Sequence, residues 1–145
     1  MINHLPITNI YLKEYFGYDS FRPGQQEVID NILAGRNTVA VFPTGGGKSI
    51  CYQIPALILP GTTVVVSPLI SLMKDQVDEL TGLKIPATFI SSILSDQEVD
   101  KRIKELANNR YKIVYIAPER FYSEPFLEAL SQIHISFVAI DEAHC

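Results

Sequence analysis

The chain has 145 residues, of which 47% are hydrophobic, and this is enough apolar material for one packed domain. Its formal net charge of -4 excludes a global positive field that would hold a polyanion by counterion release alone. Two cysteines, Cys51 and Cys145, lie far apart without the spacing of metal ligands, which argues against a disulfide framework or a zinc cluster. No apolar run approaches the ~20 residues of a membrane span, and no signal peptide is visible, so we expect a cytoplasmic protein.

Segments with strand and helix patterns alternate along the chain. Runs rich in β-branched residues predict strands buried on both faces, at residues 38–42, 62–67, 87–91, 112–117 and 137–141. Apolar residues at helical spacing predict helices at residues 7–16, 25–33, 48–58, 69–80, 97–107 and 125–133. This alternation predicts an α/β fold of three layers, αβα, with a mostly parallel sheet and ligands beyond the carboxyl ends of the strands.

A glycine-rich loop, PTGGGKS at residues 43–49, separates the first predicted strand from a predicted helix. Glycines remove every Cβ atom, so that successive backbone N–H groups can converge on phosphate oxygens at a helix N-terminus. Lys48 would reach the β- and γ-phosphates, and the hydroxyl of Ser49 would bind Mg²⁺. The alternative is a plain glycine-rich connection with a surface lysine. We favour a site for ATP and Mg²⁺ formed by Thr44, Gly45, Gly46, Gly47, Lys48 and Ser49.

This loop departs from the general phosphate-loop pattern at one position. The pattern has glycine at position 42, where this chain has Phe42. Thr44-Gly45 ahead of Gly47-Lys48 is instead similar to the helicase variant of the loop.

An acidic group follows the last predicted strand, in the sequence FVAIDEAHC at residues 137–145. A carboxylate at the tip of a buried strand needs a cation or hydrogen-bond donors. Asp141 would hold the magnesium ion through its water shell, and Glu142 would orient and deprotonate the attacking water. His144 would sense the γ-phosphate. The alternative is that these acidic residues only cap the end of a strand.

Several of these segments together resemble the RecQ DNA helicases of helicase superfamily two. The segments that carry the resemblance, in chain order, are YFGYDSFRPGQQEVI, FPTGGGKSICYQIPAL, VVVSPLISLMKDQV, YIAPER and DEAHC. The resemblance covers nearly the whole chain. It implies that residues 1–145 are an incomplete first RecA-like lobe, with adenine-recognition helices in residues 1–36 and the second lobe absent.

The resemblance also implies how adenine and DNA are bound. Gln25 would hydrogen-bond the adenine edge, with Tyr18 and Arg22 flanking the base. The alternative is that Tyr18, Phe21 and Arg22 are ordinary helix-packing and capping residues. DNA phosphates would be bound, independently of sequence, by Ser67, Ser71, Lys74 and Arg120. The alternative for this second group is helix capping, together with surface pairs between Lys74 and nearby aspartates.

The activity implied is that of a monomeric ATP-dependent 3′-to-5′ DNA helicase in DNA repair and recombination, acting on single-stranded or partly duplex DNA. This piece alone would bind nucleotide weakly and hydrolyse it slowly, because an arginine finger comes from the second lobe. An RNA helicase of the DEAD/DEAH type, a standalone nucleotide-binding module and a P-loop kinase are the alternatives.

Overall fold

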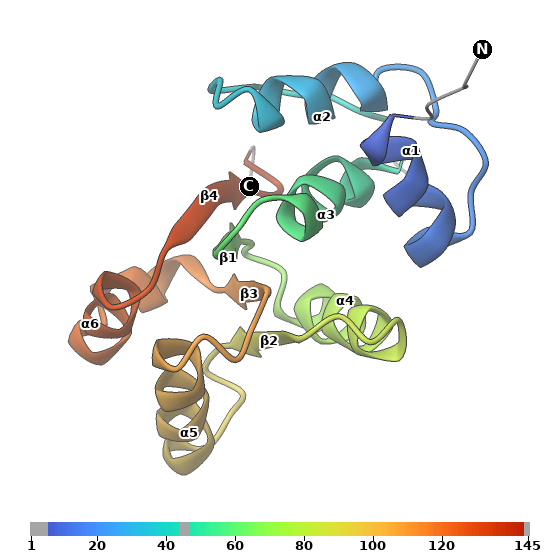
Figure 1. Cartoon of the computed structure of the whole chain (residues 1–145). Helices are drawn as coiled ribbons and strands as arrows, with labels where there is room; N and C mark the ends of the chain where they lie inside the picture. Colours follow the sequence, from blue (N-terminus) through green and yellow to red (C-terminus); the bar gives the residue numbers. More distant parts are fainter. Residues whose placement is uncertain (1–5, 44–46, 144–145) are drawn as a thin grey trace. The chain divides into compact units, whose positions relative to one another are not determined.

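The chain divides into two compact units, Met1–Leu59 and Pro60–Cys145. The computed structural model describes residues 6–43 and 47–143. In the described part of the first unit, all regular secondary structure is helical. The second unit combines helices with a sheet (Figure 1).

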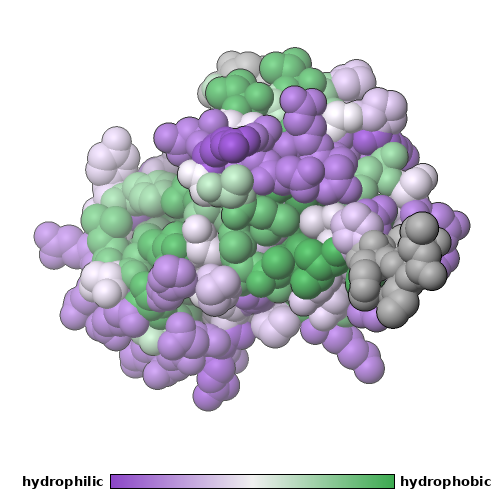
Figure 2. Space-filling view, turned by 45° about the horizontal axis from the view of Figure 1, so that its top comes forward, coloured by the Kyte–Doolittle hydropathy of each residue, from purple (hydrophilic) through white to green (hydrophobic). Residues whose placement is uncertain are grey.

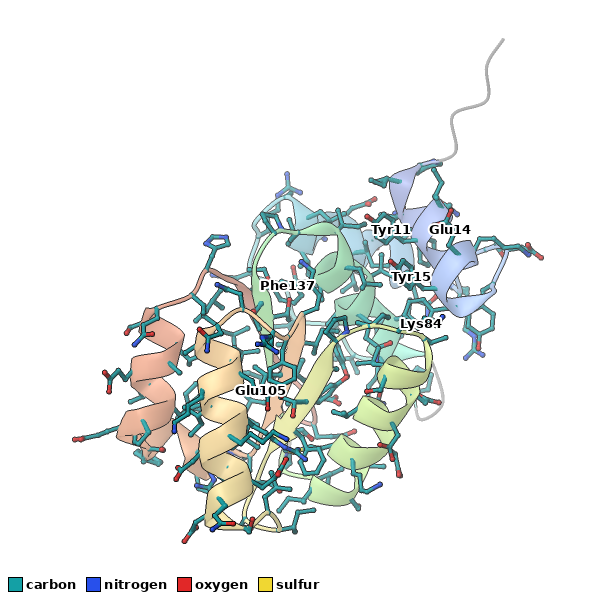
Figure 3. All side chains as sticks on the ribbon, turned by 60° about the horizontal axis from the view of Figure 1, so that its bottom comes forward. Tyr11, Glu14, Tyr15, Lys84, Glu105 and Phe137 are labelled. Carbon is teal, nitrogen blue, oxygen red and sulfur yellow. The ribbon has the colours of Figure 1, made fainter. Side chains whose placement is uncertain are left out.

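The helices of the first unit follow the apolar spacing of the sequence. They are α1 (Ile7–Tyr11), the π-helical turn η1 (Leu12–Phe16), α2 (Gln25–Leu33) and α3 (Lys48–Ile58). Leu12, Ile29 and Ile54 come from η1, α2 and α3 and are almost fully buried in one cluster. Tyr11 and Tyr15 stack beside one another with ring centroids 5.7 Å apart (Figure 3). These elements confirm the three helices predicted in this unit. The prediction succeeded because apolar residues three and four positions apart share one face of a helix.

The strand predicted at residues 38–42 is wrong. The segment has no regular secondary structure, and the side chains of Val39 and Val41 are 94% and 91% exposed. A β-branched run fits a pleated, half-buried surface, but a strand also needs a neighbour to satisfy its backbone hydrogen bonds. Within residues 6–43 and 47–143, the four strands pair only with each other, so this segment has no such neighbour.

The second unit contains a four-stranded parallel sheet in the order β2-β3-β1-β4. Its strands are β1 (Thr62–Val66), β2 (Ala87–Ile90), β3 (Ile113–Ile116) and β4 (Ile135–Ile140). The connections contain the helices α4 (Ile70–Gly82), α5 (Asp96–Ala107) and α6 (Glu124–Ser131), and the short 3₁₀ helix η2 (Pro118–Tyr122). The predicted α/β class with a parallel sheet is confirmed.

Helices cover both faces of this sheet. In Figure 1, α4 lies on one side of the sheet and α5 and α6 lie on the other. On the side covered by α5 and α6, alternate residues of the strands pack against apolar residues of the helices and form a buried core. The strand residues include Val64, Val66, Ile90, Val114 and Ile116, and the helix residues include Ile103, Leu106 and Phe126. Arg102 of α5 lies over the Phe89 ring, 4.7 Å from its centroid, and donates a hydrogen bond to the Phe89 carbonyl. These contacts hold α5 against β2.

Parallel pairing brings the carboxyl ends of all four strands to one edge of the sheet. The residues that directly follow β1, β2, β3 and β4 are Ser67, Ser91, Ala117 and Asp141. This edge is therefore where side chains of the second unit that bind a ligand are expected. At the lateral border of the sheet, β4 pairs on one side only, and its Val138 and Ile140 are exposed.

Candidate functional site

The glycine-rich segment of residues 43–49 overlaps the start of α3. Gly47 is the N-cap residue and has φ 78°, a left-handed conformation that favours glycine. Lys48 and Ser49 are the first two residues of the helix. The first N–H groups of a helix have no intrahelical partner and carry the positive end of the helix dipole. The structure thus places both side chains where an anion is stabilised. The predicted ligands Thr44, Gly45 and Gly46 lie outside the described residues.

Gln25 connects the segment before α2 to the end of this loop. Its side chain is 2% exposed, and its Oε1 accepts a hydrogen bond of 2.8 Å from the Arg22 backbone N–H. Its Nε2 donates a second bond of 2.8 Å to the Gly47 carbonyl oxygen. A Cβ atom on Gly47 would lie 2.6 Å from that Nε2, closer than real contacts allow. Only glycine therefore fits at position 47 while Gln25 makes this contact.

This arrangement adds a second role to the prediction for Gln25. The amide expected to bind adenine is buried and already bonded on both its oxygen and its nitrogen. The Arg22 guanidinium lies beside it, with Nη1 3.6 Å from the Cβ position built on Gly47. Arg22, Gln25 and the loop end are thus brought together, whereas the described contacts do not join Tyr18 to this group. That the Gln25 amide binds adenine stays a prediction.

Phe42 stands where the general loop pattern has glycine, and its half-buried ring lies beside Gly24. Its ring lies 3.5 Å from the Cβ position built on Gly24, which is the left-handed N-cap residue of α2. A Cβ atom at position 24 would make an ordinary van der Waals contact with this ring, so it is the φ of 87° that favours glycine there. Sequence reasoning noted the departure at Phe42 without finding this contact partner.

The acidic group is described as far as Ala143. The Asp141 backbone N–H donates to the Val66 carbonyl at 2.8 Å, which holds the residue beside the end of β1. Its Oδ1 accepts a 2.9 Å bond from the Glu142 backbone N–H. Glu142 has φ 56°, a left-handed conformation that is strained for a residue with a Cβ. Both side chains are half-buried at the carboxyl edge, and His144 lies outside the described residues.

The predicted DNA contacts Ser67, Ser71, Lys74 and Arg120 lie after β1 and β3. Ser67 is buried, and its hydroxyl accepts a hydrogen bond from the Leu69 backbone N–H at 3.3 Å. Ser71 and Lys74 are exposed in the first turns of α4. The Lys74 ammonium donates to Asp78 at 2.8 Å, and this hydrogen bond raises the pKa of Lys74. The alternative of a surface pair is thus present for Lys74, while DNA binding by these residues stays a prediction.

No helix within the described stretches is long and apolar enough to cross a membrane. Residues 6–43 and 47–143 also contain no group of three or more His, Cys, Asp and Glu side chains arranged to hold a metal ion.

Comparison with known proteins identifies the family. Residues 22–145 match the DEAD/DEAH box helicase family, and this match covers most of the chain. The chain belongs to the DEAD/DEAH box helicase family. The candidate nucleotide-binding residues Gly47, Lys48 and Ser49 and the acidic residues Asp141 and Glu142 all lie inside the matched part.

Within the DEAD/DEAH box helicase family, the chain is similar to RecQ proteins. It is 55% identical over 135 residues to "ATP-dependent DNA helicase RecQ" of Bacillus subtilis (strain 168), an alignment with 92% of this chain and 23% of that protein. It is 47% identical over 140 residues to the protein of the same name from Haemophilus influenzae, covering 97% of this chain and 23% of the relative. With "ATP-dependent DNA helicase Q5" of Rattus norvegicus the identity is 43%, over 92% of this chain and 15% of the relative.

The resemblance to RecQ helicases is therefore confirmed, and the RNA-helicase alternative is not favoured. The chain spans about a quarter of the length of the two bacterial relatives.

Proposed function

We propose that this chain is the ATP- and DNA-binding first lobe of an ATP-dependent 3′-to-5′ DNA helicase of the RecQ type, active in DNA repair and recombination. The observation that carries the proposal is the N-terminus of α3, where Gly47, Lys48 and Ser49 follow a glycine-rich loop and Gln25 is bonded to Gly47. The names of the relatives, which are DNA helicases, support the choice of DNA. A protein of this kind works at the DNA inside the cell and, in this proposal, as a monomer.

The residues of α3 fit a nucleoside triphosphate. The Lys48 ammonium neutralises the β- and γ-phosphates, and the N–H groups of the first helical turn donate to phosphate oxygens. Gln25 and Arg22, with Tyr18, hold the adenine base near this end of the loop. When bound, Mg²⁺ offsets the negative charge on the phosphate oxygens, and the Ser49 hydroxyl and the Asp141 carboxylate are the side chains that would hold it.

Glu142 is the proposed general base. Its carboxylate takes a proton from water as the water oxygen bonds to the γ-phosphorus and the bond from that phosphorus to the bridging oxygen of ADP breaks. The products are ADP and inorganic phosphate. His144 senses the γ-phosphate in this proposal, and Ser67, Ser71, Lys74 and Arg120 hold the DNA backbone.

A second RecA-like lobe, outside this chain, would close on the nucleotide and supply an arginine finger. Such a finger raises turnover by about three to five orders of magnitude. We therefore expect slow hydrolysis from the 145-residue chain.

The test is ATP turnover with and without single-stranded DNA, measured on this chain and on its complete reading frame, with Lys48→Ala in each. We expect slow turnover by the chain, strong stimulation by DNA in the complete protein, and loss of both with Lys48→Ala. Strong DNA-stimulated turnover by the 145-residue chain alone would contradict the role given to a second lobe. Lack of DNA stimulation in the complete protein would favour the alternative of a nucleotide-binding module without motor activity.

A further inference from the structure

Tyr122 is an exposed aromatic side chain at the carboxyl edge of the sheet in the second unit. It ends η2, the 3₁₀ helix that directly follows β3. Hydrophobic side chains reach the surface in several places (Figure 2), and the side chain of Tyr122 is 88% exposed. Nearby aromatic residues behave differently, because Tyr115 and Phe126 are almost fully buried.

The backbone that carries Tyr122 is held in place by its neighbours. The Phe121 ring packs edge-on against Phe126 of α6, with centroids 5.9 Å apart. The Ser123 N–H donates to the Arg120 carbonyl at 3.0 Å, and the Arg120 N–H donates to the Ala117 carbonyl at 3.0 Å. Phe121 thus fixes η2 on the core while the next residue faces solvent. A ring presented in this way loses little conformational freedom when a partner stacks on it.

The surroundings of Tyr122 favour stacking over charge as the source of binding energy. Residues 118–124 contain one arginine and two glutamates, so this segment has no positive excess that would attract a polyanion. The Arg120 guanidinium has no side-chain partner within residues 6–43 and 47–143. It is thus available for one phosphate, but any further energy must come from the exposed ring.

We propose that Tyr122 stacks on a base of single-stranded DNA that lies along the carboxyl edge of the sheet, next to a phosphate contact at Arg120. Proteins that bind single strands without sequence preference combine these two contacts, because every base has a π-face. The proposal rests on the proposed function and adds a base contact to the phosphate contacts already named. It also explains how a chain with net charge -4 would hold a strand with few cations.

The absence of tryptophan from the sequence gives a direct probe. Tyr122→Trp places the only tryptophan of the variant at the proposed contact, and excitation of tryptophan alone separates its emission from that of the tyrosines. Leu83→Trp is the matched control, because Leu83 is exposed but lies in the turn that leads into β2, at the opposite, amino edge of the sheet. Each 145-residue variant is added to fluorescein-labelled oligothymidylate until the protein concentration reaches about 100 µM. This titration spans the ~10⁻⁴–10⁻⁶ M range of dissociation constants for sequence-independent binding. Anisotropy reports binding, and tryptophan emission with unlabelled oligonucleotide reports stacking.

We expect the oligonucleotide to quench the emission of the Tyr122→Trp chain and to leave that of the Leu83→Trp chain unchanged. Tyr122→Ala is expected to weaken binding at least about fivefold, whereas Tyr122→Phe, which keeps the ring, stays within about twofold of the original chain. Binding seen by anisotropy without quenching, or with equal quenching of both variants, would overturn the Tyr122 proposal alone. Absence of any anisotropy change in the original chain would overturn it together with the DNA-binding part of the proposed function.

Discussion

Gln25→Glu tests the hydrogen bond that joins Gln25, the first residue of α2, to Gly47 at the end of the glycine-rich loop. The substitution replaces the side-chain NH₂ group with an oxygen atom. In the structure, Nε2 of Gln25 donates to the Gly47 carbonyl at 2.8 Å, and the side chain is almost fully buried. A carboxylate in its place would put an oxygen that cannot donate opposite the Gly47 carbonyl oxygen, so that two acceptors would face each other. The variant loses one hydrogen bond, about 1 kcal/mol, and buries a carboxylate against the Gly47 carbonyl oxygen, so we expect a total loss of about 2–4 kcal/mol in the free energy of unfolding.

The effect of Gln25→Glu depends on pH, and its sign follows from burial. A carboxyl that is buried against a carbonyl oxygen has a raised pKa, because the charged form is desolvated and repelled. Its protonated form donates to the Gly47 carbonyl and restores the bond. The variant is therefore most stable below the ordinary carboxyl pKa of about 4.3 and loses stability as pH rises through the raised value in the folded state.

The assay is urea unfolding followed by far-ultraviolet circular dichroism, between about pH 5 and about pH 8. Gln25→Met is the matched control, because it has similar volume but no donor or acceptor, and its loss should not change over this range. We expect the deficit of Gln25→Glu to grow towards the higher pH and that of Gln25→Met to stay constant. A Gln25→Glu chain as stable as the original at about pH 8 would refute the reasoning and the link with it.

Three further outcomes are expected. Phe126→Ala should destabilise the second unit by about 3–5 kcal/mol in urea unfolding, because this side chain is fully buried between α6 and the sheet, whereas the exposed Leu127→Ala should cost far less. Ser95→Ala should cost about 1 kcal/mol in the same assay, since the Ser95 hydroxyl accepts the Glu98 N–H at 3.2 Å at the start of α5, and a deficit near zero would contradict this capping role. Burial raises the pKa of the Cys51 thiol to about 11, so in a Cys145→Ser background iodoacetamide at about pH 8 should alkylate the native chain much more slowly than the urea-unfolded chain, and equal rates would contradict the burial.

The helices α2 and α3 could be predicted to the residue from sequence. Apolar side chains recur there at helical spacing, and a glycine in the left-handed conformation precedes each helix, at Gly24 and Gly47. Residues 38–42 are also rich in apolar side chains, but the strand predicted there does not form. A run of β-branched residues indicates a preference for a half-buried sheet surface. It does not show whether another strand lies beside the run to pair with it.

At the candidate site, the sequence predicted that Lys48 and Ser49 begin a helix, as they do, whereas nucleotide binding by these residues stays a prediction. Loop chemistry indicated Lys48 and Ser49 because phosphate binding needs these residue types in this order. The bond between Gln25 and Gly47 could not be predicted, because it joins a side chain to a backbone carbonyl 22 positions away. Such a contact leaves no residue pattern beyond a glycine. The exposure of Tyr122 was equally hidden, since Phe121 beside it has similar chemistry and packs against Phe126.

The central claim is that the loop of residues 43–49 binds ATP with magnesium. Isothermal titration calorimetry of the 145-residue chain with magnesium and a non-hydrolysable ATP analogue tests it most directly, with Lys48→Ala measured beside it. We expect one site in the original chain and at least about tenfold weaker binding in Lys48→Ala, because removing a charged donor to phosphate costs about 1.5–3 kcal/mol. Equal affinity of the two chains, or no binding by an original chain whose circular dichroism shows it to be folded, would contradict the claim.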